Sequence, residues 1–415
     1  MKARASSLVA GLAGMVAGGL LMITVGAPAE ELEPSERDAD AEPLGIAPLR
    51  PAPARPPEDP VLLVWTAGAL PDGLTHDVAE LPLVTDVTVV AGGRLDLVAS
   101  DTAGGAAVDR FEDGWGVALD ALAIEPATYA GFVPAADRTT VAGLGSDRAL
   151  LGATSARLRR LRAGDTVTLA SGHTLTVAGV LDDVVVAGAE VVVARAVAEE
   201  LSIGADRFLL VSHRGNRTEL ESAIRALASV EVRVRGPGET PFLRHGDAVL
   251  PQVQIKERFG EFSYRIPSAG EATFDQEPRW AHESLVTVDL PILGATHCHR
   301  DVVGQMSQAL QELVDRGLAH LVDPEGFEGC YNPRLVTPGG LPSRHAWGVA
   351  LDVNADVNPT GQAPGQDRRL VDTFARWGLT WGGFWLVPDP MHFEYLREPA
   401  ADPAKVTPGP DAGTD

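Results

Sequence analysis

Short segments with alternating hydrophobic and polar residues recur between residues 60 and 240. The clearest are 166–169 and 174–177, which flank the turn residues Ser171-Gly172 and together predict a β-hairpin. Further strands are expected at 87–90 and 95–98 around a Gly92-Gly93 turn, at 208–211 and at 230–234. A capping box at Thr218 and Glu221 predicts a helix that continues to Leu227. Residues 60–240 are therefore predicted to form a mixed α+β domain.

Residues 250–398 are richer in aromatic side chains and show two kinds of pattern. Hydrophobic residues recur on one face of a helix expected over 300–317, at Val303, Met306, Leu310 and Leu313. The segments 348–354 and 392–395 instead alternate like strands. The chain as a whole is therefore predicted to be an α+β protein of two domains, with the second over residues 250–398.

The N-terminal segment 1–29 has the pattern of a signal sequence. Lys2 and Arg4 precede the uncharged run 8–26, and Ala27-Pro28-Ala29 offers the small residues that a signal peptidase accepts. The run also has about the 20 residues of a membrane-spanning helix, so cleavage and retention as a membrane anchor both remain open. Either outcome predicts that the rest of the chain lies outside the cytoplasm, secreted or tethered to the membrane.

Composition and charge narrow the classes of partner. The segment 30–59 is rich in proline and acidic residues and is expected to be an extended linker, and the tail 399–415 is expected to be disordered. The formal net charge of −23 argues against a nucleic-acid-binding protein, which would need a basic face. An acidic surface is also a poor match for anionic lipid.

The chain has only two cysteines, Cys298 and Cys330. Outside the cytoplasm, a disulfide between them is the economical interpretation. The alternative is a metal cluster at His297-Cys298-His299. Three adjacent residues in regular structure do not all point toward one ion, which favours the disulfide.

The residues with the clearest chemistry lie in the two strand-like segments of the second domain. Asp352 shares a strand face with small and polar residues, and His345 lies just before that strand. In the later segment, His392 shares a strand face with Glu394, opposite Phe393 and Tyr395. Two imidazoles and one carboxylate match the three-ligand set of a catalytic zinc site, with a fourth position left for water. Each residue alone has a simpler structural explanation, and the hypothesis depends on their combination.

Asp389, three residues before His392, is the candidate for the general base that takes a proton from the metal-activated water. The segment Gly329-Cys330-Tyr331-Asn332-Pro333-Arg334 resembles one that supplies an arginine to the site of the peptidase family named below, which implies that Arg334 stabilises negative charge on the substrate. A surface salt bridge is the alternative explanation for this arginine. Trp385, in Trp381-Gly382-Gly383-Phe384-Trp385, is expected to form one wall of the cleft, although hydrophobic packing explains tryptophans equally well.

These motifs resemble the VanY-type D-alanyl-D-alanine carboxypeptidases, a zinc peptidase family that also contains L-alanyl-D-glutamate endopeptidases. The resemblance rests on Ser343-x-His345-x-x-Gly348-x-Ala350-x-Asp352 and on Asp389-x-x-His392-Phe393-Glu394. It implies a domain with a small antiparallel sheet and flanking helices. It assigns zinc binding to His345, Asp352 and His392, the base to Asp389, and substrate binding to Ser343. Many carboxypeptidases of the family have Glu at the position of Asp389, so the bond that is cleaved stays open.

The segment 147–194 resembles the extracytoplasmic domain of MacB- and FtsX-type permeases. The resemblance lies in a helix expected at Leu150-Leu151-Gly152, the Ala163-Gly164-Asp165 turn and the hairpin that follows. It implies no catalytic residues and suggests that residues 60–240 position the enzyme or bind a protein partner.

The sequence therefore predicts a zinc peptidase that hydrolyses peptidoglycan stem peptides, at the terminal D-Ala-D-Ala bond or at an internal L,D link. The competing hypotheses are a non-catalytic module that binds cell-wall peptides and a regulator of a membrane complex.

Overall fold

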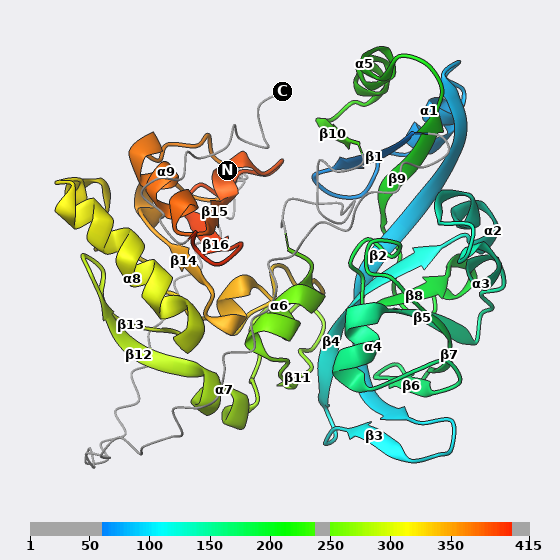
Figure 1. The fold of residues 1–415 in the computed structure, drawn as a ribbon, viewed down its shortest axis with the longest axis horizontal. Coiled ribbons are helices and arrows are strands. Elements are labelled where there is room, and N and C mark those ends of the chain that lie inside the picture. Colours follow the sequence, from blue (N-terminus) through cyan, green and yellow to red (C-terminus); the bar gives the residue numbers. More distant parts are fainter. Residues whose placement is uncertain (1–59, 237–249, 401–415) are drawn as a thin grey trace, which may run out of the picture. The chain divides into compact units, whose positions relative to one another are not determined.

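The computed structural model describes residues 60–236 and 250–400 (Figure 1). The predicted signal or anchor segment, the linker 30–59 and the chain beyond residue 400 lie outside the described residues. The described residues form one compact unit. Within the described ranges, no helix is both long enough and apolar enough to cross a membrane.

Six strands of the N-terminal part pair in a closed ring. Their order is β2–β6–β7–β5–β8–β4, and β4 pairs again with β2. The ring strands are β2 (Val84–Asp101), β4 (Trp115–Ile124), β5 (Arg148–Gly152), β6 (Thr166–Leu169), β7 (Thr174–Leu181) and β8 (Val191–Ala194). Burial alternates along β6 and β7, so each of these two strands turns one hydrophobic face toward the interior of the ring, whereas β8 is buried throughout.

The long strand β2 also belongs to a second layer outside the ring. There it pairs with β9 (Asp206–His213), which pairs with β1 (Val61–Thr66), and β1 pairs with β10 (Val232–Arg235). The helices α1 (Leu74–Ala79) and α5 (Arg217–Leu227) pack beside this layer and share a core with it. The shorter elements are β3 (Ala107–Arg110), α2 (Pro126–Tyr129), α3 (Arg138–Ala142) and α4 (Ala153–Arg159).

Three local predictions in this part were wrong, although the hairpin β6–β7 formed as predicted. No turn occurs at Gly92-Gly93, where β2 runs straight through and both glycines pair with β4. Leu150-Leu151-Gly152 forms the buried strand β5 rather than a helix. The cap of α5 is Asn216, whose side chain accepts from the backbone N–H groups of Thr218 and Glu219.

The C-terminal part combines helices with two small sheets. The hairpin β12 (Leu285–Leu290) and β13 (Gly294–His299) packs on α8, and a three-stranded antiparallel sheet has the order β14–β16–β15. Its strands are β14 (Ala350–Asp352), β15 (Leu379–Trp381) and β16 (His392–Tyr395). The remaining elements are α6 (Gln252–Phe259), β11 (Tyr264–Arg265), α7 (Pro278–Ser284), α8 (Arg300–Asp315), α9 (Arg368–Arg376) and the 3₁₀ turns η4 (Arg344–Trp347), η5 (Ala355–Val357) and η6 (Gly382–Phe384).

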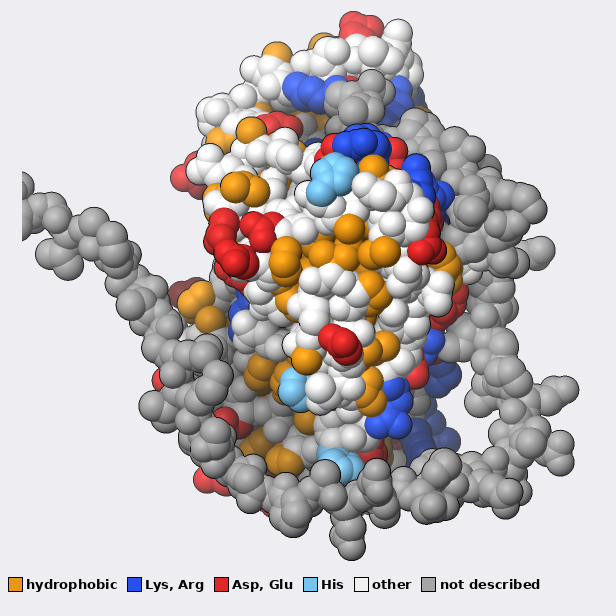
Figure 2. All heavy atoms as spheres, turned by 90° about the vertical axis from the view of Figure 1, so that its left-hand side faces the viewer, with side chains coloured by type: hydrophobic (Ala, Val, Ile, Leu, Met, Phe, Trp, Pro, Cys, Tyr) orange, Lys and Arg blue, Asp and Glu red, His pale blue; other side chains and the backbone are white. Residues whose placement is uncertain are grey.

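The helix α8 buries the face that its sequence pattern predicted. Met306, Leu310 and Leu313 are fully buried in the C-terminal core, while Val303 packs at its margin. Partly buried and exposed residues alternate along β12 and β13, so one face of this hairpin stays open to solvent. Figure 2 shows this side of the molecule, where hydrophobic side chains gather between acidic and basic ones.

The structure confirms a mixture of helices and sheets. Contacts nevertheless cross the boundary that the sequence predicted between the two parts. β11 pairs with the ring strand β4, and Ala118 of that strand belongs to the core of the C-terminal part. Residues 250–400 are therefore held to residues 60–236 by backbone hydrogen bonds as well as by side chains.

Candidate metal centre

The three-stranded sheet and the turn before it bring three candidate ligands together. Asp352 ends β14 and lies directly opposite His392, the first residue of β16, in the antiparallel register. His345 lies in η4, which ends at Gly348 in the left-handed conformation with φ of 66°. That turn reverses the chain just before β14, so the His345 ring reaches the same side of the sheet. All three side chains are buried.

The ligand atoms of these residues form a small triangle. His345 Nε2 lies 3.2 Å from His392 Nδ1 and 3.0 Å from an Asp352 carboxylate oxygen. His392 Nδ1 lies 2.9 Å from the other Asp352 oxygen. Atoms held about 2.0–2.1 Å from a tetrahedral zinc ion lie roughly 3.3–3.4 Å apart. The triangle is thus close to the size that such an ion requires.

The other ring nitrogen of each histidine has a partner that fixes its tautomer. His345 Nδ1 donates to the backbone carbonyl of Cys330 at 2.8 Å, and His392 Nε2 donates to the Glu394 carboxylate at 3.2 Å. In a neutral imidazole the remaining nitrogen then carries a lone pair. Both lone pairs and the Asp352 carboxylate point at one place, so the three acceptors form a group that could hold a metal ion.

The pKa shifts of the buried groups also indicate that a positive charge is stabilised at this position. Burial disfavours a charged imidazole, but hydrogen bonds to Asp352 and Glu394 outweigh it and raise the pKa of His392 to about 10. Burial likewise acts against a charged Asp352, yet hydrogen bonds from His345 and His392 hold its pKa well below the usual range. A proton on His392 supplies the positive charge when no metal does, and a metal must displace it.

Two residues near the triangle were not among the predicted site residues. Glu394 is fully buried behind His392, and its pKa is lowered because hydrogen bonding to His392 and the charge of Arg344 outweigh burial. Arg344 is also buried and donates to the carbonyl of Leu250 at 2.6 Å. The alternation of His392, Phe393 and Glu394 along β16 was the sequence signal for Glu394, because it places His392 and Glu394 on one face.

Asp389, the predicted base, lies on the tight turn that leads into β16. The backbone N–H of His392 donates to the Asp389 carbonyl at 3.0 Å, so the two residues are fixed in one turn. Its carboxylate is half-buried and accepts from the hydroxyl of Thr360 at 2.7 Å. A Cβ atom added at Gly382 would lie 3.2 Å from Asp389 Cβ and 3.4 Å from His392 Cβ, so glycine keeps the space between them open.

The remaining predicted site residues occupy different surroundings. Arg334 is half-buried, and its guanidinium has no hydrogen-bond or ion-pair partner within the described ranges. Ser343 is buried, and its hydroxyl caps η4 by accepting from the backbone N–H of His345 at 3.3 Å. Trp385 is half-buried, with its ring centroid 5.3 Å from that of His392.

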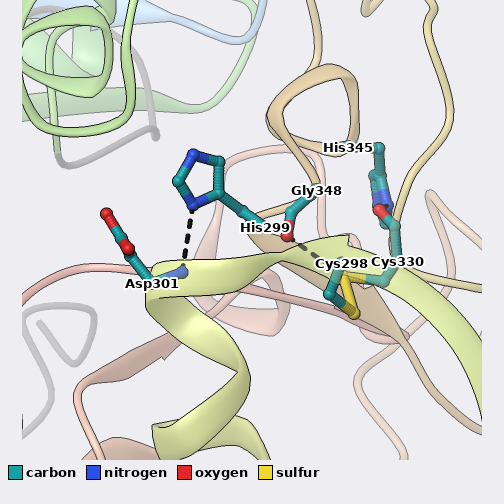
Figure 3. The surroundings of a disulfide bond; sticks show 6 residues. All are labelled: Cys298, His299, Asp301, Cys330, His345 and Gly348. Carbon is teal, nitrogen blue, oxygen red and sulfur yellow. Dashed lines mark hydrogen bonds between the residues drawn. A yellow bond between two sulfur atoms is a disulfide. The ribbon is translucent and has the colours of Figure 1, made fainter. Parts of the chain in front are cut away.

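A disulfide joins Cys298, near the end of β13, to Cys330 (Figure 3). Because the Cys330 carbonyl accepts from His345, the disulfide anchors the backbone group that orients this ring. The alternative metal cluster at His297-Cys298-His299 is not formed. His297 bonds to Thr287, and His299 caps α8 by accepting from the backbone N–H of Asp301.

Removing this disulfide is expected to destabilise the protein. The bond spans 32 positions, and closing a loop of that length contributes about 3–4 kcal/mol in the chain-entropy treatment. The double variant Cys298→Ala/Cys330→Ala should lose this amount in urea-induced unfolding, and reduced wild-type protein should match it. An unchanged free energy of unfolding in both samples would contradict the expectation.

Comparison with known proteins agrees with the C-terminal resemblance. Residues 337–395 match a family model described as D-alanyl-D-alanine carboxypeptidase, which supports a peptidase. The matched segment contains Ser343, His345, Asp352, Asp389 and His392, while Arg334 lies before it. The predicted family resemblance is thereby confirmed for this segment. No curated protein sequence matches the chain.

Two solved structures resemble part of the chain at low identity. The periplasmic region of MacB from Actinobacillus actinomycetemcomitans is 10% identical, with a TM-score of 0.29, and the match covers 42% of this chain and 88% of that one. The extracellular domain of the noncanonic ABC-type transporter YknZ from Gram-positive bacteria is 11% identical, with a TM-score of 0.28, and the match covers 43% and 99%. The likeness to MacB-type domains is thus found again, and at these TM-scores it carries no argument about function.

Proposed function

We propose that this chain is a zinc-dependent peptidase that hydrolyses peptidoglycan stem peptides. The observation that carries the proposal is the convergence of three acceptor atoms, from His345, Asp352 and His392, at the spacing of a tetrahedral metal site. The match of residues 337–395 to D-alanyl-D-alanine carboxypeptidases supplies the substrate class. The complete ligand set favours an enzyme over a non-catalytic peptide-binding module.

The donor set fits zinc better than the other common divalent cations. Two imidazole nitrogens and one carboxylate oxygen are typical of catalytic zinc sites, whereas magnesium and calcium prefer ligand sets made of oxygen. Zinc held by three protein ligands supplies Lewis-acid activation of water and of a peptide carbonyl. The outer partners of both histidines are already in place, so the two rings need no reorientation to bind the ion.

The surrounding residues can perform the remaining tasks. The Asp389 carboxylate accepts a proton during hydrolysis, and Thr360 holds its orientation through the hydroxyl hydrogen bond. The guanidinium of Arg334, which has no ion-pair partner among the described residues, binds a carboxylate or carbonyl of the substrate. The ring of Trp385 forms an apolar wall beside His392. Ser343 contributes by holding η4, and through it the backbone of His345.

The disulfide supports an extracytoplasmic location, because a disulfide persists in an oxidising compartment. The proposed substrate, peptidoglycan, is also extracytoplasmic. A membrane tether through the N-terminal segment would keep the enzyme near the wall and raise its effective concentration there. To test the tether, the rate of cell-wall hydrolysis by the full chain is compared with the rate of a soluble form that begins at residue 60. Equal rates would contradict the tether.

Mass spectrometry of defined muropeptides tests the activity and identifies the bond. The metal-loaded full chain is expected to release D-alanine from pentapeptide stems or to cleave between L-alanine and D-glutamate. Chelation should abolish the product, and zinc should restore it. Absence of any cleaved stem peptide with the zinc-loaded protein would overturn the proposed activity.

The Glu394→Gln variant is expected to bind zinc about 10–100-fold more weakly, because partners behind a ligand histidine typically contribute that much. Glutamine keeps the shape but removes the charge that fixes the Nε2–H tautomer of His392. Competition with a chromogenic chelator measures the affinity. Glu283→Gln, at an exposed glutamate of α7, serves as the control and should bind zinc like the wild type. Equal affinity of Glu394→Gln and wild type would show that the charge is dispensable.

A further inference from the structure

The N-terminal part contacts a hairpin turn beside the candidate site. Residues 335–342 form this turn, in which Leu335 and Pro342 pair and the backbone N–H of Val336 donates to the Leu341 carbonyl at 2.8 Å. The turn connects Arg334 directly to Ser343. Arg94, on the ring strand β2, donates from Nη1 to the carbonyl of Gly340 at 3.3 Å. One side of the site is therefore held by an arginine from outside residues 250–400.

Arg94 itself is fixed in place and largely buried. Its Nε lies 3.2 Å from an Asp96 oxygen, and the side chains are 10% and 12% exposed. The hydroxyl of Tyr264, in β11, donates to the same Asp96 oxygen at 2.5 Å. Because both ends of this chain of contacts are anchored, the guanidinium reaches Gly340 from a rigid base rather than as a flexible surface side chain.

A second contact holds another segment beside the site. Arg233, on β10, donates to the backbone carbonyl of Phe384. Two residues further on, Leu386 is buried in a core cluster otherwise made of residues from the N-terminal part, such as Leu63 and Trp65. These contacts fix the segment 382–389, which carries Trp385 and ends at the candidate base Asp389.

A buried ionic cluster also keeps the two parts together. Glu190 directly precedes β8. Its carboxylate lies 3.1 Å from the guanidinium of Arg159 and 2.7 Å from the ammonium group of Lys256 in α6. Glu261 pairs with the same two cations. Arg159, Glu190 and Lys256 have side chains that are 1%, 0% and 3% exposed. Separating the parts would leave buried charges without partners, which is strongly unfavourable.

We propose that residues 60–236 form a frame that positions the two substrate-binding sides of the metal site, with Arg94 and Arg233 as its positioning residues. This inference rests on the proposed peptidase function. Neither arginine contacts the metal ligands among the interactions described above, and each acts on a backbone carbonyl of a segment beside the site. Loss of either contact loosens one side and weakens productive substrate binding, while the metal triangle stays intact.

The test uses the full, zinc-loaded chain with Arg94→Met and Arg233→Met, which keep side-chain length but remove the donor. The frame predicts a fall in kcat/KM of about 10–100-fold, since small misplacement of binding groups has effects of this size. The zinc affinity should remain that of the wild type. Hydrogen exchange should rise at 335–342 in Arg94→Met and at 382–389 in Arg233→Met. The variants Arg94→Lys and Arg233→Lys keep one donor group. They should recover part of the lost kcat/KM and part of the lost protection from hydrogen exchange.

Two control variants separate this effect from general loss of charge or stability. Arg110→Met and Arg225→Met remove arginines of the same part whose ion pairs, with Asp101 and Glu221, stay within residues 60–236. Both should retain wild-type kcat/KM and exchange at the two segments. If a methionine variant does not melt cooperatively, the corresponding lysine variant is compared with the wild type instead.

The outcomes distinguish the frame from the peptidase function. If the wild type cleaves stem peptides and the Arg94 and Arg233 variants match it in kcat/KM and hydrogen exchange, the frame is overturned and the peptidase stands. If the wild type cleaves no stem peptide, the peptidase is overturned and hydrogen exchange decides the frame. Local deprotection confined to the two segments supports it, and unchanged protection contradicts it.

Discussion

Replacing Asp352 with asparagine is expected to abolish both metal binding and peptidase activity. Asparagine has nearly the same shape, but it removes the only negative charge in the triangle with His345 and His392. Losing a group behind a ligand typically costs 10–100-fold in affinity, so losing the charged ligand itself should cost more than about 100-fold. Metal content after dialysis, measured by mass spectrometry, and chelator competition both report the loss.

Asp356→Asn is the matched control for this variant. Asp356 lies four residues further on, in η5, and its side chain is exposed. The control should keep one zinc ion per chain and full activity. If Asp352→Asn retained zinc with wild-type affinity, the triangle would not be the metal site and the proposed function would fail with it.

Replacing Asp389 with asparagine is expected to lower kcat by about 10²–10⁴-fold, which is the usual contribution of a general base. Zinc affinity should stay unchanged, because Asp389 is not part of the triangle. The asparagine carbonyl can still accept from Thr360, so the turn before β16 should keep its geometry. Initial rates on a defined pentapeptide stem, measured together with zinc content, separate loss of the base from loss of the metal.

Asp315→Asn, at the exposed end of α8, is the control for removing one negative charge and should leave kcat unchanged. A fully active Asp389→Asn enzyme would assign the proton transfer to another group.

Two of the three candidate ligands, Asp352 and His392, could be predicted because strand alternation is a strong local signal. The pattern around Asp352 and His392 placed each on one face of a strand, and the antiparallel pairing of β14 with β16 sets them opposite each other. The outer partner of His345 could not be predicted, because it is the backbone carbonyl of Cys330 and every residue has such a group. Glu394 had a signal in the alternation of β16, but its burial behind His392 depends on the whole domain.

The closed ring of strands could not be predicted from the sequence, because it depends on pairings between segments that are far apart along the chain. The hairpin β6–β7 is local and was predicted, whereas β2 with β4 and β4 with β8 join segments that no local pattern connects. Leu150 and Leu151 illustrate the limit. A short hydrophobic run fits a buried strand as well as a helix, and here pairing with β7 and β8 makes it a strand.

The ionic cluster around Glu190 bears on how the catalytic half can be produced in isolation. A fragment that starts at residue 250 would keep Lys256 and Glu261 but lose Arg159 and Glu190. It would also uncover Gln252, whose amide donates to the Ala118 carbonyl, and strand β11, which pairs with β4. Such a fragment should aggregate or unfold when expressed alone. Co-expression with residues 60–236 as a separate chain should restore a soluble, zinc-binding complex.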